Sequence, residues 1–296
     1  MHTRKPMVVV KRWWKRGLLV AVLAAVGIWG YELAAVRGTF VAFRSAADAG
    51  GSAIVAGASG HRIVGRAYVT GPPTSSAPLV VVLHGDAPFI HPGYQYAVAA
   101  DLADAVPGTR VVALMRPGYA DAYGARSDGD RGFASGENYT RAVADDVAAA
   151  IQSLKQQWRA PSVVLVGHSG GAAVAANVAA LAPGLVQHAF LVGCPCDVPA
   201  FRRHMARLQR SPMWLLPADS LSPMQTLDRM ETTTEVTAIS GADDPITLPA
   251  YARGYVAKAE ARDIPASLIV LPGKGHEILG DPAVLSRVSQ AVRQAN

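Results

Sequence analysis

The run SVVLVGHSGG, residues 162–171, decides how this sequence of 296 residues folds. Its first half is a β-branched apolar run typical of a buried strand, and it leads into a helix of small residues. The glycines on either side of Ser169 permit a sharp strand-to-helix turn, where larger side chains would clash. Such a turn lifts the serine hydroxyl above the sheet and surrounds it with the N–H groups of the helix N-terminus. The stretch therefore predicts an accessible nucleophile at the end of a central strand.

Working outward, short apolar runs alternate with longer helical patterns along the chain. Because strands that are apolar throughout need cover on both faces, this alternation predicts an α/β fold. We expect a mostly parallel central sheet with helices on both faces. The expected strands are 62–70, 79–83, 111–115, 162–166, 186–192, 235–240 and 267–271, and the expected helices are 94–105, 138–158, 172–181, 249–262 and 282–294.

A base and an acid for Ser169 follow two later strands. His276 comes just after the strand at 267–271, and Asp243 and Asp244 come just after the strand at 235–240. The carboxyl ends of parallel strands meet at one edge of the sheet, so we expect these side chains to meet Ser169 there. A serine nucleophile needs a base, and the base needs an acid that orients it. The pattern predicts a triad of Ser169 and His276 with Asp244 or Asp243.

Two further motifs give the chain a resemblance to a known family. They are Leu83-His84-Gly85-Asp86 after one central strand and Met115-Arg116-Pro117-Gly118-Tyr119 after the next. The chain also has the strand-to-helix turn at Ser169, called the nucleophile elbow below, then the turn with Asp243 and Asp244, and then His276. With these motifs in this order, residues from about 60 to 296 resemble the α/β-hydrolases.

The resemblance implies backbone oxyanion donors at Asp86 and Gly170. It places the acid at Asp244, because the family turn is similar to G-x-x-D-P, and leaves Asp243 as the alternative. The acidic side chain of Asp86 is a departure, because many relatives carry a neutral residue at this position. Its carboxylate must point away from the developing negative charge of the oxyanion.

The expected chemistry is transfer of an acyl group from a small-molecule ester or amide to water, through a covalent intermediate on Ser169. This chemistry requires no organic cofactor and no metal. Two alternatives stay open: an aminopeptidase-like serine peptidase with the same triad, and a non-catalytic binding protein on a hydrolase fold. The sequence does not specify the oligomeric state.

The positive charge of the chain is concentrated at its N-terminus. Six of the 28 Lys and Arg residues lie in the first sixteen positions, and the rest of the chain carries 22 basic and 22 acidic residues. The remainder is formally neutral, so no nucleic-acid partner is expected.

An apolar run over 17–31 follows the basic tail, and residues 1–36 are expected to form a transmembrane anchor or uncleaved signal. A cleaved signal and a buried helix are the alternatives, and the basic flank predicts a catalytic domain outside the cytoplasm.

The remaining organisation is a linker over 37–60, a catalytic domain over 61–296, and a small helical cap inserted at about 197–234. Asp197 is expected to cap a helix in that insertion, with Phe201, Met205 and Leu208 on one apolar face. The two cysteines, Cys194 and Cys196, are expected as thiols in a turn, with a strained disulfide as the alternative.

Overall fold

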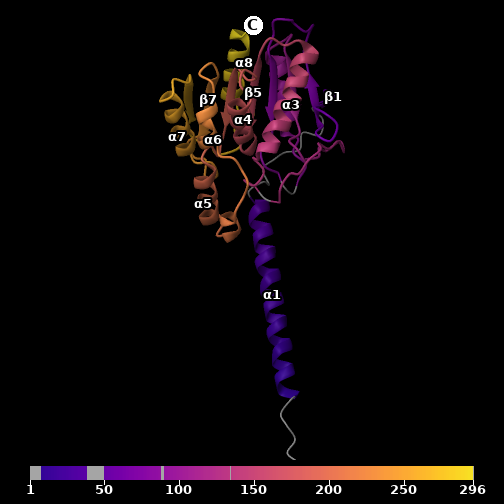
Figure 1. The fold of residues 1–296 in the computed structure, drawn as a ribbon, viewed down its shortest axis with the longest axis vertical. Helices are drawn as coiled ribbons and strands as arrows, with labels where there is room; N and C mark the ends of the chain where they lie inside the picture. Colours follow the sequence, from indigo (N-terminus) through magenta and orange to yellow (C-terminus); the bar gives the residue numbers. More distant parts are fainter. Residues whose placement is uncertain (1–7, 39–49, 88–89, 134, 296) are drawn as a thin grey trace, which may run out of the picture.

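A computed structural model describes residues 8–38, 50–87, 90–133 and 135–295, with the backbone alone described for 8–14 and 31–38. The part of the chain from residue 50 onward is built on one eight-stranded sheet in the order β1-β2-β4-β3-β5-β6-β7-β8 (Figure 1). β2 runs antiparallel to β1 and to β4, and the other neighbouring pairs are parallel. The predicted mostly parallel sheet is confirmed. The strands are β1 Ser52–Ala56, β2 Ile63–Tyr68, β3 Leu79–Leu83, β4 Arg110–Leu114, β5 Val163–His168, β6 His188–Val192, β7 Glu235–Gly241 and β8 Ala266–Leu271.

Helices cover both faces of this sheet. Along β3, alternate residues pack into two different clusters: Leu79, Val81 and Leu83 face α3 and α4, while Val80 and Val82 face α2 and α8. All five side chains are buried, which explains why the strand is apolar at every position. The helices are α1 Val8–Gly38, α2 Tyr94–Ala105, α3 Arg141–Trp158, α4 Gly170–Leu181, α5 Val198–Leu208, α6 Pro223–Thr226, α7 Pro249–Glu260 and α8 Pro282–Gln294, with short 3-10 turns η1 Pro212–Leu215 and η2 Leu227–Arg229.

The cap lies between β6 and β7 and consists of α5, η1, α6 and η2. The Asp197 carboxylate accepts a hydrogen bond from the Ala200 N–H at 3.0 Å and so caps α5 as expected. Of the three residues expected on one apolar face, Phe201 and Met205 are buried, whereas Leu208 at the end of the helix is 47% exposed.

The N-terminal part differs from the expectation in two ways. Among the described residues, no helix combines the length and the apolar character that crossing a bilayer requires, so the transmembrane anchor is not supported. The expected linker over 37–60 contains β1, which pairs with the edge of the sheet through β2. Residues 39–49 of that linker lie outside the described part of the chain.

Candidate active site

The turn between β5 and α4 holds Ser169 in a strained conformation. Ser169 has φ 53° and ψ −123°, a left-handed φ that non-glycine residues rarely adopt. Its N–H donates to the Val192 carbonyl at 2.8 Å, which ties the turn to the end of β6. A Cβ at Gly167 would collide with the backbone of α4, and one at Gly171 would collide with the His84 carbonyl. The glycines are therefore required by close backbone approach, as the sequence predicts.

Ser169, His276 and Asp244 form one hydrogen-bonded chain. His276 Nε2 lies 2.9 Å from Ser169 Oγ, and His276 Nδ1 lies 2.8 Å from Asp244 Oδ2. All three residues are at least nine-tenths buried, and they come from the loops after β5, β7 and β8. The geometry is that of a nucleophile, a base and an orienting acid.

The loop after β7 also separates the two candidate acids. Asp244 accepts hydrogen bonds from the Ile246 and Thr247 N–H groups at 2.8 and 2.9 Å and from the Thr247 hydroxyl at 2.6 Å. Burial alone would raise the pKa of Asp244, but hydrogen bonds and charge from His276, together with Thr247, hold this pKa below its ordinary value. Asp243, in contrast, is exposed. The structure thus brings Asp244 and not Asp243 to His276.

The loop after β3 contains Asp86, the expected oxyanion donor, whose buried carboxylate accepts three hydrogen bonds. It accepts from Arg116 Nη1 at 2.8 Å, from the Tyr139 hydroxyl at 2.6 Å and from the Gly136 N–H at 2.8 Å. A Cβ at Gly170 would collide with this carboxylate, so the loop and the start of α4 are in direct contact.

Arg116 and Tyr139 were not predicted as partners of Asp86 from the sequence. Arg116 is fully buried beside that carboxylate, where burial would lower its pKa but the charge of Asp86 raises it above its ordinary value. One signal was available: a buried acid needs a cation, and β3 and β4 are neighbours whose carboxyl ends meet. Tyr139 lies in a loop before α3 and carries no comparable signal.

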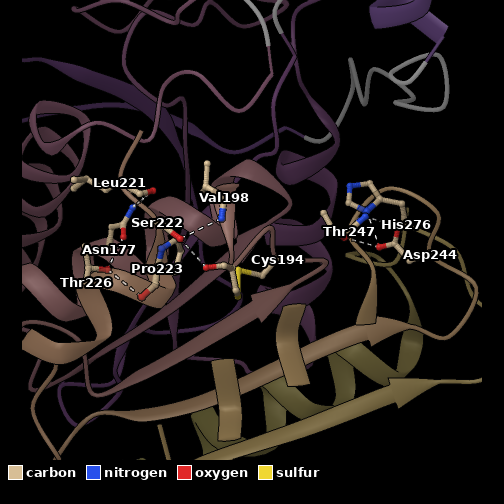
Figure 2. Close-up of a disulfide and its surroundings, with 11 residues drawn as sticks. Asn177, Cys194, Val198, Leu221, Ser222, Pro223, Thr226, Asp244, Thr247 and His276 are labelled. Carbon is tan, nitrogen blue, oxygen red and sulfur yellow. Dashed lines mark hydrogen bonds and ion pairs between the residues drawn. A yellow bond between two sulfur atoms is a disulfide. The ribbon is translucent and has the colours of Figure 1, made fainter. Parts of the chain in front are cut away.

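The two cysteines form a disulfide, Cys194–Cys196, so the expectation of two free thiols is wrong. Both are buried directly after β6, and the Cys196 carbonyl accepts from the Met224 N–H in the cap at 2.9 Å. Figure 2 shows the disulfide between Ser222 of the cap on one side and the pair of Asp244 and His276 on the other. A Cβ at Gly193, beside Cys194, would lie 3.2 Å from the His276 ring, so this segment contacts both the cap and the site.

Comparison with known proteins agrees with this architecture. Residues 78–218 match the family model described as the alpha/beta hydrolase fold. No curated protein matches the chain.

Among solved structures, the proline iminopeptidase of Mycobacterium smegmatis is 15% identical, with a TM-score of 0.57 over 82% of this chain and 98% of that one. An esterase of Pyrobaculum calidifontis is 16% identical, with a TM-score of 0.60 over 91% and 92%. Est1E of Butyrivibrio proteoclasticus is 14% identical, with a TM-score of 0.54 over 82% and 96%. The chain is therefore a protein of the α/β-hydrolase fold.

Proposed function

We propose that this protein is a serine hydrolase that cleaves carboxylic esters or amides through an acyl-enzyme. One observation carries the proposal: the hydrogen-bonded chain from Ser169 through His276 to Asp244, at the carboxyl edge of the sheet. The esterase and peptidase names of similar folds are compatible with this chemistry, and at their low identity they support the fold alone.

The first half of the reaction forms the acyl-enzyme. Ser169 Oγ attacks the substrate carbonyl carbon, and its proton passes to His276 Nε2. Asp244 accepts a hydrogen bond from the Nδ1–H of the resulting imidazolium and stabilises the positive charge of that ring. The backbone N–H groups of Asp86 and Gly170 are proposed to bind the oxyanion. His276 then protonates the leaving alcohol or amine as the carbonyl re-forms.

The second half releases the acid. A water molecule takes the place of the leaving group, His276 removes its proton, and the hydroxide attacks the acyl carbon. The oxyanion binds the same two N–H groups. His276 Nε2 finally returns its proton to Ser169 Oγ, and the free carboxylic acid leaves.

The test is covalent labelling with a fluorophosphonate probe, together with turnover of p-nitrophenyl acetate. Ser169→Ala should abolish labelling and lower kcat by a factor on the order of 10⁴ or more. Ser286→Ala, at an exposed serine on α8, serves as the matched control and should change neither. Unlabelled wild-type protein without turnover of any ester or amide would leave only a binding role.

Glu277 favours a second candidate, a peptidase that acts on an amino-terminal residue. This carboxyl directly follows His276 and is exposed, and desolvation by its surroundings raises its pKa against the charge of His276. When ionised, it would attract the α-ammonium group of an aminoacyl substrate. Glu277→Gln should then lower kcat/KM for aminoacyl p-nitroanilides and spare p-nitrophenyl acetate. Equal effects on both substrates would favour the esterase.

We also propose that the catalytic domain acts outside the cytoplasm. Six basic residues precede the apolar run at 17–31, a pattern typical of segments that direct export. The Cys194–Cys196 disulfide supports this location, since disulfides persist in oxidising compartments. A C-terminal reporter that is active only after export should give signal, and the size of the mature chain would separate a retained segment from a cleaved one. Signal only from a reporter active in the cytoplasm would contradict the proposal.

A further inference from the structure

Two polar side chains, the partly buried Tyr94 and the fully buried His168, lie beside the triad without belonging to it. Tyr94 is the first residue of α2, and His168 is the last residue of β5, directly before Ser169. The Tyr94 hydroxyl lies 2.6 Å from the Gly85 nitrogen and 2.8 Å from His168 Nδ1. On the other side of the ring, His168 Nε2 lies 3.1 Å from the carbonyl oxygen of His276.

These contacts admit one consistent placement of protons. The His276 carbonyl can only accept, so His168 Nε2 carries a proton and donates to it. His168 Nδ1 then accepts from the Tyr94 hydroxyl, which in turn accepts from the Gly85 N–H. Burial lowers the pKa of His168 to about 3, so the ring is neutral near pH 7 and carries one proton. The result is a single chain of three hydrogen bonds with one direction.

Each point along this chain is next to a group of the proposed reaction. Gly85 precedes Asp86, whose N–H is a proposed oxyanion donor. His168 precedes the nucleophile Ser169, and the chain ends on the backbone of His276, whose side chain is the proposed base. The oxyanion loop also touches the elbow directly, because a Cβ at Gly85 would lie 3.0 Å from Ser169 Cβ. The segments that follow β3, β5 and β8 are thus joined by side chains, although β8 neighbours neither of the other two strands in the sheet.

We propose that Tyr94 and His168 are positioning residues that hold the oxyanion loop, the nucleophile and the base in register for acyl transfer. The proposal rests on the proposed hydrolase function and assigns these two residues a role in it. Their hydrogen bonds reach backbone atoms of Gly85 and His276, and the His168 ring also lies against the His276 ring, with the ring centroids 5.1 Å apart. They act through these contacts and through the position of Ser169.

The expected effect on catalysis follows from the geometry. Tyr94→Phe keeps the ring in place and removes only the hydroxyl, which leaves the Gly85 N–H and His168 Nδ1 without this partner. The oxyanion loop is then free to shift relative to Ser169, and a displacement of about 1 Å costs on the order of 100-fold in rate. A change in the register of catalytic groups alters kcat and leaves ground-state binding, and so KM, nearly unchanged.

Tyr96→Phe provides a matched control. Tyr96 is buried on the same helix, and its hydroxyl donates to Asp121 at 3.0 Å, away from the triad. Both variants remove one hydroxyl and one donated hydrogen bond from α2. A merely structural role for Tyr94 would therefore make the two variants similar in melting temperature and in kcat.

The experiment measures kcat and KM for p-nitrophenyl acetate, the rate of fluorophosphonate labelling and the melting temperature of the full-length variants. Tyr94→Phe should lower kcat and the labelling rate by about 10- to 100-fold with KM within about twofold, while Tyr96→Phe keeps both rates. His168→Gln places an amide donor near the position of Nε2 and should retain more activity than His168→Leu. Because the chain acts as a unit, Tyr94→Phe combined with His168→Leu should lose little more than His168→Leu alone.

Two results would overturn the proposal in distinguishable ways. If wild-type protein labels and turns over but Tyr94→Phe and Tyr96→Phe have equal kcat, the positioning role is refuted and the hydrolase function stands. If the wild type neither labels nor turns over, the hydrolase function is refuted and the positioning role with it. Should Tyr94→Phe fail to fold, the comparison of His168→Gln with His168→Leu still decides: equal kcat in these two variants refutes the role of the chain.

Discussion

Acid should destabilise this protein well above the pH at which its carboxylates titrate, because three buried histidines are held neutral. Burial lowers the pKa of His84 and His168 to about 3 and that of His188 to about 4. His84 and His168 are fully buried, and the His188 side chain is 12% exposed. An unfolded chain returns each of them to the ordinary histidine pKa of about 6.5.

The sign of the effect follows from proton binding. Between pH 6.5 and pH 4 the unfolded state binds protons that the folded state does not, so the free energy of unfolding falls as the pH falls. From pH 7 to pH 5, each histidine lowers this free energy by about 2 kcal/mol, and the three together lower it by about 6 kcal/mol. That loss is comparable to the whole stability of many domains, which is about 5–15 kcal/mol. Asp244, whose pKa is lowered, titrates below this window.

Urea unfolding followed by circular dichroism at several pH values between 7 and 5 measures how the free energy of unfolding changes with pH. His188→Gln is the informative variant, because His188 lies at the amino end of β6, at the opposite edge of the sheet from the triad. A glutamine amide can keep the contact that His188 Nε2 makes with Thr237 Oγ1 at 2.9 Å. The variant should lose about one third of the pH dependence. Equal free energies of unfolding at pH 7 and pH 5 in the wild type would refute the reasoning.

Three other substitutions test the site. Asp244→Asn should lower kcat by about 10⁴-fold and Asp243→Asn should have little effect, and steady-state kinetics showing the reverse would place the acid at Asp243. Arg116→Met leaves the Asp86 carboxylate buried without its cation and should cost about 3–5 kcal/mol in urea unfolding; a loss below about 1 kcal/mol would contradict this. Gly170→Ala places a methyl group against that carboxylate and should slow fluorophosphonate labelling, whereas labelling at the wild-type rate would show that the loop can move aside.

Sequence patterns predicted the central strands well because burial on both faces leaves a simple signal. β3 is apolar at all its positions, and its predicted and observed bounds agree. β1 was missed because it is a mostly exposed edge strand whose short apolar run, 53–56, lies in a stretch rich in Gly, Ala and Ser. The short helices α6 and η2 carry no periodicity of their own, so their prediction requires the tertiary contacts of the cap.

Some residues of the site can be predicted from local sequence patterns, and others depend on tertiary contacts. Gly167 to Gly171 predicts the elbow from local geometry alone, and the order of the later loops points to Asp244 and His276. His168, in contrast, has partners 74 and 108 residues away in the sequence, so no local pattern can show that its ring joins two other loops. Its neutral state likewise depends on burial in the folded chain.

The carboxylate of Asp86 poses an electrostatic problem that its partners answer. An isolated carboxylate about 5 Å from a developing oxyanion would oppose it by about 3 kcal/mol at an effective dielectric constant of about 20. Arg116 is buried at 2.8 Å from that carboxylate, so the oxyanion faces a pair of opposite charges and the repulsion is reduced. The same carboxylate orders its own surroundings, since it accepts from the Gly136 N–H, and the Gly136 carbonyl accepts from Arg202 of the cap at 3.1 Å. An acidic residue in the oxyanion loop is therefore compatible with the proposed chemistry only together with Arg116, and the pair gives the cap a hydrogen-bonded route to that loop.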